Sequence, residues 1–274
     1  MPCFDRSLLT SQSVRTHGVR SIASVGVLGG LAAEQHAVAS PAMPAPTNVA
    51  PGIHGGPASS SSVGYNALIR FYTAPGFAVV APNIRGSTGF GRAYEQADDV
   101  AKRLDALKDV ESVAKWTQAQ PWAEPTQLVI WGGSYGGYMV LMGMTRQTDL
   151  WRAGVDLVGP SNWRSFMATT TGQIREVLSK EFGSLESDGP FLDSISPLRD
   201  VERVKSPLFV FQGQNDPRVP RAESDQIVFS LRARGVAVEY MVAPDEGHSL
   251  DRRPNQVAFA ARTTLFLQKH LGMK

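Results

Sequence analysis

The sequence predicts an α/β fold with a mostly parallel central sheet and helices on both faces. From residue 52 onward, short apolar runs with strand character alternate with stretches of helical periodicity. The apolar runs are continuous, which is typical of strands buried on both faces of a sheet. Strands that alternate with helices form parallel sheets, because each helix carries the chain back to the same edge.

Each element of this pattern can be placed along the chain. The first strand is expected at 77–81, where an apolar run is closed by Pro82. A helix is expected over 98–119, beginning with the acidic residues Asp98 and Asp99, which favour a helix N-terminus. Gly235 is expected to end a helix at 224–234. The remaining strands are expected at 127–131, 153–158, 208–211 and 236–242, and the remaining helices around 139–144 and from about 255 to just before Gly272.

The composition describes a globular protein and excludes several classes. Of 274 residues, 42% are hydrophobic, and the formal net charge is +2. No Lys/Arg run is long enough to bind phosphates, so we expect no nucleic-acid partner. No apolar stretch reaches about 18 residues, so we expect no membrane-spanning helix. Cys3 is the single cysteine, which excludes an intrachain disulfide and a cysteine zinc site. No ligand cluster predicts a metal, and we expect no cofactor.

The N-terminal region differs from the rest of the chain. Residues 1–51 are expected to form a poorly ordered tail and linker, and residues 52–274 the folded domain. The segment 37–51 is rich in Ala and Pro, which favours an extended linker. Ala37-Val38-Ala39 has the small-x-small pattern of a signal cleavage site. The preceding apolar run is interrupted by glycines, so the expected location is cytoplasmic, with secretion as the alternative if residues 1–39 act as a signal peptide.

Ser134 stands in the segment Trp131-Gly-Gly-Ser-Tyr-Gly-Gly137, between an apolar strand and a helix. This is the context of a G-x-S-x-G nucleophile elbow, in which a sharp turn exposes the serine hydroxyl at the carboxyl end of the sheet. The turn is strained and needs small neighbours, which Gly132 and Gly136 provide. A phosphate loop would carry Gly-Lys-Ser/Thr, which is absent. We therefore predict Ser134 as a nucleophile; the alternative is a turn that only packs.

A nucleophilic serine needs a histidine base. Two histidines follow Ser134 in the chain, His248 and His270. His248 lies in a loop directly after a strand, where open α/β sheets carry functional residues. His270 falls in the last turn of the terminal helix, where it offsets the helix dipole. His248 is therefore the predicted base.

A carboxylate must orient that histidine, and Asp216 is the predicted acid. It lies in the turn that ends the strand at 208–211. Asp225 lies inside the following helix, where we expect it to be solvated. Asp245 and Glu246 share the loop of the histidine and remain competitors for the role.

The segment His54-Gly55-Gly56-Pro57 is interpreted as an oxyanion loop. Two glycines before a proline bring bare backbone N–H groups close to a ligand, as in HGG-type loops. The other donor is the backbone N–H of Tyr135, the residue after the serine. Each donor of this kind contributes roughly 3 kcal/mol in the transition state. His54 is expected to hold the loop through hydrogen bonds and not to act as the base.

Together these segments resemble the catalytic domain of the prolyl oligopeptidase family, in its acylaminoacyl-peptidase-like branch. The resemblance is collinear over about residues 53 to 270. It implies an α/β-hydrolase catalytic domain with the catalytic residues Ser134, Asp216 and His248 and the oxyanion donors Gly56 and Tyr135. It rests on the HGGP loop, Pro82–Gly91, the serine turn, Ser196-Pro197, Asn215–Pro220 and Pro244–His248.

The chain departs from the family pattern in two places. Family members normally carry a β-propeller before this domain, which admits only short peptides. Only fifty-odd residues precede the HGGP loop here, so we expect no propeller. The family also has an apolar strand before HGGP, whereas Val49-Ala-Pro-Gly52 stands here, and proline is a poor fit for a central strand. Either a degraded strand still pairs, or the sheet is incomplete.

The predicted function is hydrolysis of ester or amide bonds through an acyl-enzyme on Ser134, as a serine peptidase or a carboxylesterase. Both substrates pass through the same tetrahedral intermediate, so the catalytic residues do not distinguish them. The family favours peptides, and the expected lack of a propeller favours small acyl esters. The alternative is a truncated chain that is catalytically impaired or non-catalytic, or a binding module.

The segment 159–199 carries Trp163 and Phe166, which we expect either to line a substrate pocket or to pack in the core. Without a propeller, apolar surface around them would be exposed, and exposed apolar patches often become interfaces. The expected partners are therefore a small acyl ester or short peptide, and a second copy of the chain in a homodimer. Neither a nucleic acid nor a membrane is expected as a partner.

Overall fold

The computed structural model describes residues 15–16, 19–22, 35–38, 47–62, 64–73 and 77–272. Over these residues the strands form one sheet in the order β1-β2-β3-β5-β4-β6-β7-β8-β9. The strands β4 to β9 run parallel, whereas β1, β2 and β3 join antiparallel beside β5. Their bounds are β1 Arg15–Thr16, β2 Val19–Ile22, β3 Gln35–Val38, β4 Thr47–Ile53, β5 Ala78–Pro82, β6 Ala123–Gly133, β7 Ala153–Leu157, β8 Leu208–Gly213 and β9 Val238–Ala243.

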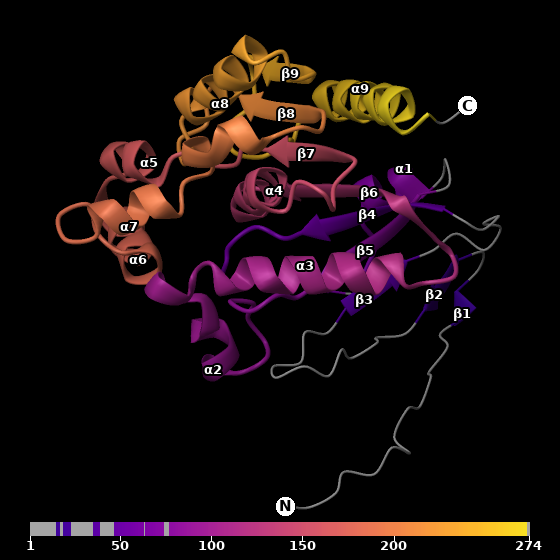
Figure 1. Ribbon diagram of the computed structural model, residues 1–274, viewed down its shortest axis with the longest axis horizontal. Coiled ribbons are helices and arrows are strands. Elements are labelled where there is room, and N and C mark those ends of the chain that lie inside the picture. Colours follow the sequence, from indigo (N-terminus) through magenta and orange to yellow (C-terminus); the bar gives the residue numbers. More distant parts are fainter. Residues whose placement is uncertain are drawn as a thin grey trace, which may run out of the picture.

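Helices cover both faces of this sheet, as Figure 1 shows. The longer ones are α3 Asp105–Gln118, α4 Tyr135–Arg146, α8 Arg221–Ala233 and α9 Arg253–Leu271. A group of shorter ones, α5 Trp163–Thr169, α6 Gly172–Phe182 and α7 Gly189–Ser194, lies beyond the carboxyl ends of the strands (Figure 1). The others are α1 Ala67–Thr73, α2 Arg92–Glu95 and the 3₁₀ turns η1 Gln96–Asp98, η2 Val100–Lys102 and η3 Pro197–Arg203. None of the helices in the described part of the chain is long and apolar enough to cross a membrane.

The core has two layers because successive side chains of a strand point to opposite faces. Along β8, Leu208 and Val210 pack in the layer that contains α3, α4 and α8, whereas Phe209 and Phe211 pack in the layer of α1 and α9. All four side chains are buried, which explains the continuous apolar run in the sequence. The prediction of an α/β fold with helices on both faces is confirmed.

The strand before the HGGP loop is formed. β4 lies inside the sheet between β5 and β6, and Pro51 is paired with Val80 of β5. Gly52 leaves the space in which the indole of Trp131 packs, and that indole donates a hydrogen bond to the carbonyl of Ala50, 3.2 Å away. A proline removes one ladder donor, and the other bonds of the strand remain. The expected domain boundary between 51 and 52 therefore falls within β4.

The expected element boundaries differ from the observed ones most at one long segment. The helix expected over 98–119 begins only at Asp105, and η1 and η2 occupy the preceding residues. Asp98 does not lie in the first turn of that helix, because its side chain is buried in an ion pair with Arg103. The signal-like pattern expected within residues 1–39 lies largely outside the described residues.

Candidate functional site: a serine, histidine and aspartate at the carboxyl edge of the sheet

Ser134 occupies the sharp turn between β6 and α4. Its backbone has φ 57° and ψ −117°, a left-handed conformation that costs free energy for a residue other than glycine. A side chain at Gly136 would collide with the carbonyl of Ile53, and one at Gly132 would lie 2.6 Å from the backbone of Gly136. The two glycines therefore let strand and helix approach closely enough to form the turn.

Two backbone hydrogen bonds hold this strained residue. The N–H of Ser134 donates to the carbonyl of Leu157 at the end of β7, over 2.8 Å. The carbonyl of Ser134 accepts from the N–H of Tyr138 in the first turn of α4, over 2.9 Å. The hydroxyl of Ser134 is thus presented at a fixed place above the helix N-terminus.

Ser134, His248 and Asp216 form one chain of hydrogen bonds. Nε2 of His248 lies 3.0 Å from the hydroxyl oxygen of Ser134, and Nδ1 lies 2.8 Å from Oδ2 of Asp216. Ser134 follows β6, Asp216 follows β8 and His248 follows β9. The carboxyl ends of these parallel strands share one edge of the sheet. The geometry is that of a nucleophile, a base and a group that orients the base.

The loop after β8 fixes the carboxylate of Asp216. Its side chain is fully buried, and Oδ1 accepts hydrogen bonds from the backbone N–H groups of Arg218 and Val219, over 2.8 and 3.0 Å. One oxygen is therefore held by the backbone while the other faces His248. This arrangement positions the imidazole.

The other candidate acids and the second histidine are engaged elsewhere. Asp225 accepts from the hydroxyl of Tyr240, Asp245 forms an ion pair with Arg252, and Glu246 accepts from the backbone of residues 251 and 252. The ring of His270 lies against Phe266, with 4.7 Å between ring centroids. Among the acids considered from the sequence, Asp216 is the one that contacts His248.

The HGGP loop follows β4 and lies against the serine turn. A Cβ atom placed on Gly55 would come within 3.5 Å of Cβ of Ser134. Gly56 has φ +128°, a conformation that favours glycine. Tyr135 is the first residue of α4, so its backbone N–H has no acceptor within the helix. The roles of Gly56 and Tyr135 as oxyanion donors remain a proposal.

His54 braces this loop against the segment after β5. Its Nδ1 donates to the carbonyl of Gly55 over 2.7 Å, and its Nε2 lies 2.8 Å from the hydroxyl oxygen of Ser87. Burial lowers the pKa of His54, and the hydrogen bond to Gly55 opposes this shift in part. These contacts give His54 a bracing position, as expected from the sequence, and it makes no recorded contact with Ser134.

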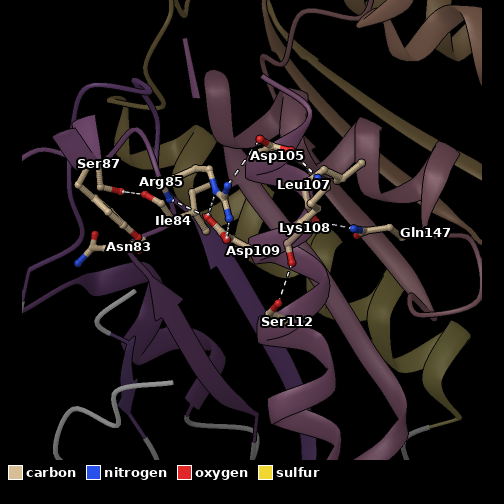
Figure 2. Close-up of polar contacts among 11 residues, drawn as sticks. Asn83, Ile84, Arg85, Ser87, Asp105, Leu107, Lys108, Asp109, Ser112 and Gln147 are labelled. Carbon is tan, nitrogen blue, oxygen red and sulfur yellow. Dashed lines mark hydrogen bonds and ion pairs between the residues drawn. The ribbon is translucent and has the colours of Figure 1, made fainter. Parts of the chain in front are cut away.

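The segment after β5 is itself fixed to α3. Figure 2 shows Ser87 bonded to the carbonyl of Ile84, and the guanidinium of Arg85 reaching Asp109 and Asp105. Nη2 of Arg85 lies 2.7 Å from Oδ1 of Asp109, and the backbone N–H of Arg85 donates to Oδ2 of the same residue. The HGGP loop therefore rests on a segment that is anchored to a long helix.

Trp163 and Phe166 do not themselves form the exposed apolar surface that was expected around them. Their exposed fractions are 2% and 5%. The indole of Trp163 stacks on the ring of Phe182 at 3.7 Å between centroids, and Tyr138 and Phe166 pack around it edge-on. α6 supplies Phe182 as a cover, so Trp163 and Phe166 themselves offer no apolar surface to a second copy of the chain.

Sequence reasoning missed one buried carboxyl group beneath the serine turn. Asp156 interrupts the apolar run of β7, which was the available signal. Its Oδ1 accepts from the N–H of Gly159 over 3.0 Å, and it packs against Gly137 in the first turn of α4. Burial raises the pKa of Asp156 from 3.8 to about 8, and the Gly159 hydrogen bond opposes this shift.

We expect Asp156→Asn to stabilise the protein increasingly as the pH rises from about 4 to about 8. The unfolded chain loses the aspartate proton near pH 4, whereas the folded chain keeps it until about pH 8. The wild type therefore loses unfolding free energy across this window, and the asparagine variant does not lose this contribution. Urea denaturation of both proteins at several pH values measures the difference, with Asp149→Asn as an exposed control. A difference that stays constant between pH 4 and pH 8 would contradict the assignment.

The fold and the serine–histidine–aspartate chain define the α/β-hydrolase class. The model of the prolyl oligopeptidase family matches residues 64–274, and this chain belongs to that family. The family expected from the sequence is therefore confirmed.

Individual relatives agree with this placement. The chain is 39% identical to dipeptidyl aminopeptidase BIII of Pseudoxanthomonas mexicana, over 80% of this chain and 33% of the relative. It is 28% identical to the acylamino-acid-releasing enzyme of Mus musculus, over 80% of this chain and 31% of the relative. A puromycin-hydrolyzing peptidase of Mycobacterium tuberculosis superposes with a TM-score of 0.85 at 26% identity, over 94% of this chain and 40% of that one. The chain thus spans about a third of the length of these curated relatives.

Proposed function

We propose that this chain is the catalytic domain of a serine peptidase that cleaves short peptides through an acyl-enzyme on Ser134. The observation that carries the proposal is the pair of hydrogen bonds that joins His248 to Ser134 and to Asp216. Family membership supports a peptidase. The names of the relatives, a dipeptidyl aminopeptidase and an acylamino-acid-releasing enzyme, support a short peptide as the substrate class.

In this mechanism the hydroxyl of Ser134 attacks the scissile carbonyl while Nε2 of His248 takes its proton. Asp216 holds the imidazole in the tautomer whose Nε2 is free to accept, and it stabilises the imidazolium that forms. As negative charge develops on the carbonyl oxygen, the backbone N–H groups of Gly56 and Tyr135 donate hydrogen bonds to it. His248 then gives the proton to the leaving amine, and water releases the acyl group by the same route.

A small acyl ester is the second substrate class, because an ester passes through the same intermediate. A panel of dipeptidyl anilides, acetyl-amino-acid anilides and acetyl esters separates the two, with the full chain as the enzyme. We expect hydrolysis of the peptide anilides, since family membership favours amide substrates. Hydrolysis of the esters alone would support a carboxylesterase instead. No hydrolysis of any substrate by the folded chain would support the non-catalytic alternative.

A further inference from the structure

A fully buried ion pair lies next to the serine turn and has no part in the mechanism above. Asp98, the last residue of η1, pairs with Arg103, which follows η2, and their side chains are 1% and 0% exposed. Removing two charges from water costs several kcal/mol per ion unless further hydrogen bonds compensate. The other hydrogen bonds of this ion pair therefore indicate which parts of the fold it stabilises.

The pair holds the side chain of Tyr135. The hydroxyl of Tyr135 donates to Oδ2 of Asp98 over 3.1 Å and accepts from Nη1 of Arg103 over 3.2 Å. Burial raises the pKa of Tyr135 well above its ordinary value, so the hydroxyl keeps its proton and remains a donor. The ring of Tyr135 is buried and lies 5.8 Å from the ring of Tyr138 between centroids.

The pair also contacts α6, one of the short helices beyond the carboxyl ends of the strands. Nη2 of Arg103 donates to the carbonyl of Glu181 over 3.0 Å, and the guanidinium carbon lies 3.9 Å from the ring centre of Phe182. Phe182 is the residue that covers Trp163. The carboxyl group of Asp98 packs against Gly86, in the segment that braces the HGGP loop. The pair is therefore in contact with α4, with α6 and with the segment after β5.

Tyr135 connects this buried ion pair to the proposed catalytic site. Its backbone N–H is a proposed oxyanion donor, and it directly follows Ser134, whose φ of 57° is strained. A strained backbone persists only where the surroundings hold it from several sides. Two backbone bonds hold Ser134 itself, and the anchored side chain of Tyr135 holds the next residue.

We propose that Asp98 and Arg103 are positioning residues that act through the hydroxyl of Tyr135 and keep its backbone N–H aimed at the oxyanion. The proposal rests on the function proposed above. A displacement of about 1 Å in such a group can lower the rate about a hundredfold. Neither Asp98 nor Arg103 contacts the substrate in this scheme.

Tyr135→Phe removes the hydroxyl and keeps the ring, so it tests the link with little risk to the fold. We expect kcat to fall between about tenfold and a hundredfold, the upper value being the loss expected for a misplacement of about 1 Å. We expect KM to change little, because the donor acts on the charge that develops in the transition state. A variant with unchanged kcat would overturn the proposal.

Asp98→Asn tests the ion pair, and Asp200→Asn is its matched control. Asp200 pairs with Arg146 at the opposite end of α4, with 2.8 Å between the charged groups, and that pair has no recorded bond to Tyr135. We expect both variants to lose unfolding free energy in urea, but only Asp98→Asn to lose kcat per folded molecule. Equal kcat values in the two variants would make the Asp98 pair merely structural and would overturn the proposal.

The backbone amide resonance of Tyr135 provides a readout that needs no turnover. In ¹⁵N-labelled protein it should shift and broaden in Asp98→Asn and stay in place in Asp200→Asn. An unchanged resonance in Asp98→Asn would overturn the positioning role whether or not the wild type is active. A wild type that fails to hydrolyse any substrate would contradict the proposed function separately.

Discussion

Replacing Ser134 with alanine should lower kcat by about a millionfold, the loss typical when a nucleophilic serine is removed. Nε2 of His248 contacts the hydroxyl of Ser134, and among the described residues no other hydroxyl forms a hydrogen bond with that nitrogen, so none is placed to make the nucleophilic attack. The fold should survive, because the turn is held by backbone bonds of Ser134 and by glycines, which alanine at this position leaves in place.

A fluorophosphonate probe, which forms a covalent bond with an activated serine, gives a direct measurement. The wild type should be labelled, Ser134→Ala should not, and Ser112→Ala should be labelled like the wild type. Ser112 is an exposed residue of α3 whose hydroxyl donates to the carbonyl of Lys108, so it serves as the matched control. Labelling that persists in Ser134→Ala would contradict the assignment of the nucleophile.

Replacing His248 with alanine should cost nearly as much, again about a millionfold in kcat. Without the imidazole the hydroxyl of Ser134 has no base to take its proton, and the carboxylate of Asp216 loses the group that it orients. Asp216→Ala should be milder, about 10⁴-fold, because the acid makes no bond to the substrate.

The matched control for His248 is His270→Ala. His270 lies in the last turn of α9, where its ring packs against Phe266. Turnover of an activated ester and thermal unfolding should both be measured for each variant. Near-wild-type turnover by His248→Ala, or a large loss of turnover in His270→Ala, would show that the wrong histidine has been chosen.

The residues of the hydrogen-bonded chain could be selected from the sequence because each stands in a local pattern with its own signal. Ser134 lies between glycines at a strand-to-helix junction, and Asp216 and His248 follow apolar strand runs. Parallel strands bring their carboxyl ends to one edge, so knowing that three residues follow three such strands is enough to expect them together.

Other features depended on contacts between segments far apart in the sequence. From the sequence, Trp163 and Phe166 could line a pocket or pack in the core. They pack in the core, because Phe182 of α6 stacks on the indole of Trp163 and covers it. The sequence predicts Asp98 at a helix N-terminus. In the structure its carboxyl group is buried, where it pairs with Arg103 and accepts a hydrogen bond from the hydroxyl of Tyr135. Nothing in the local sequence around Asp98 indicates a tyrosine 37 positions further along the chain.

The sequence by itself determined the α/β class and the family, and it singled out the serine, histidine and aspartate that the structure joins by hydrogen bonds, because periodicity and turn glycines are local properties of a chain. Only the tertiary structure decided that β4 pairs through Pro51, that Trp163 is covered, and that a buried ion pair anchors Tyr135. The physical reason is that burial and charge pairing depend on which neighbours fill the space around a side chain. Those neighbours come from other elements that reach it only when the chain has folded.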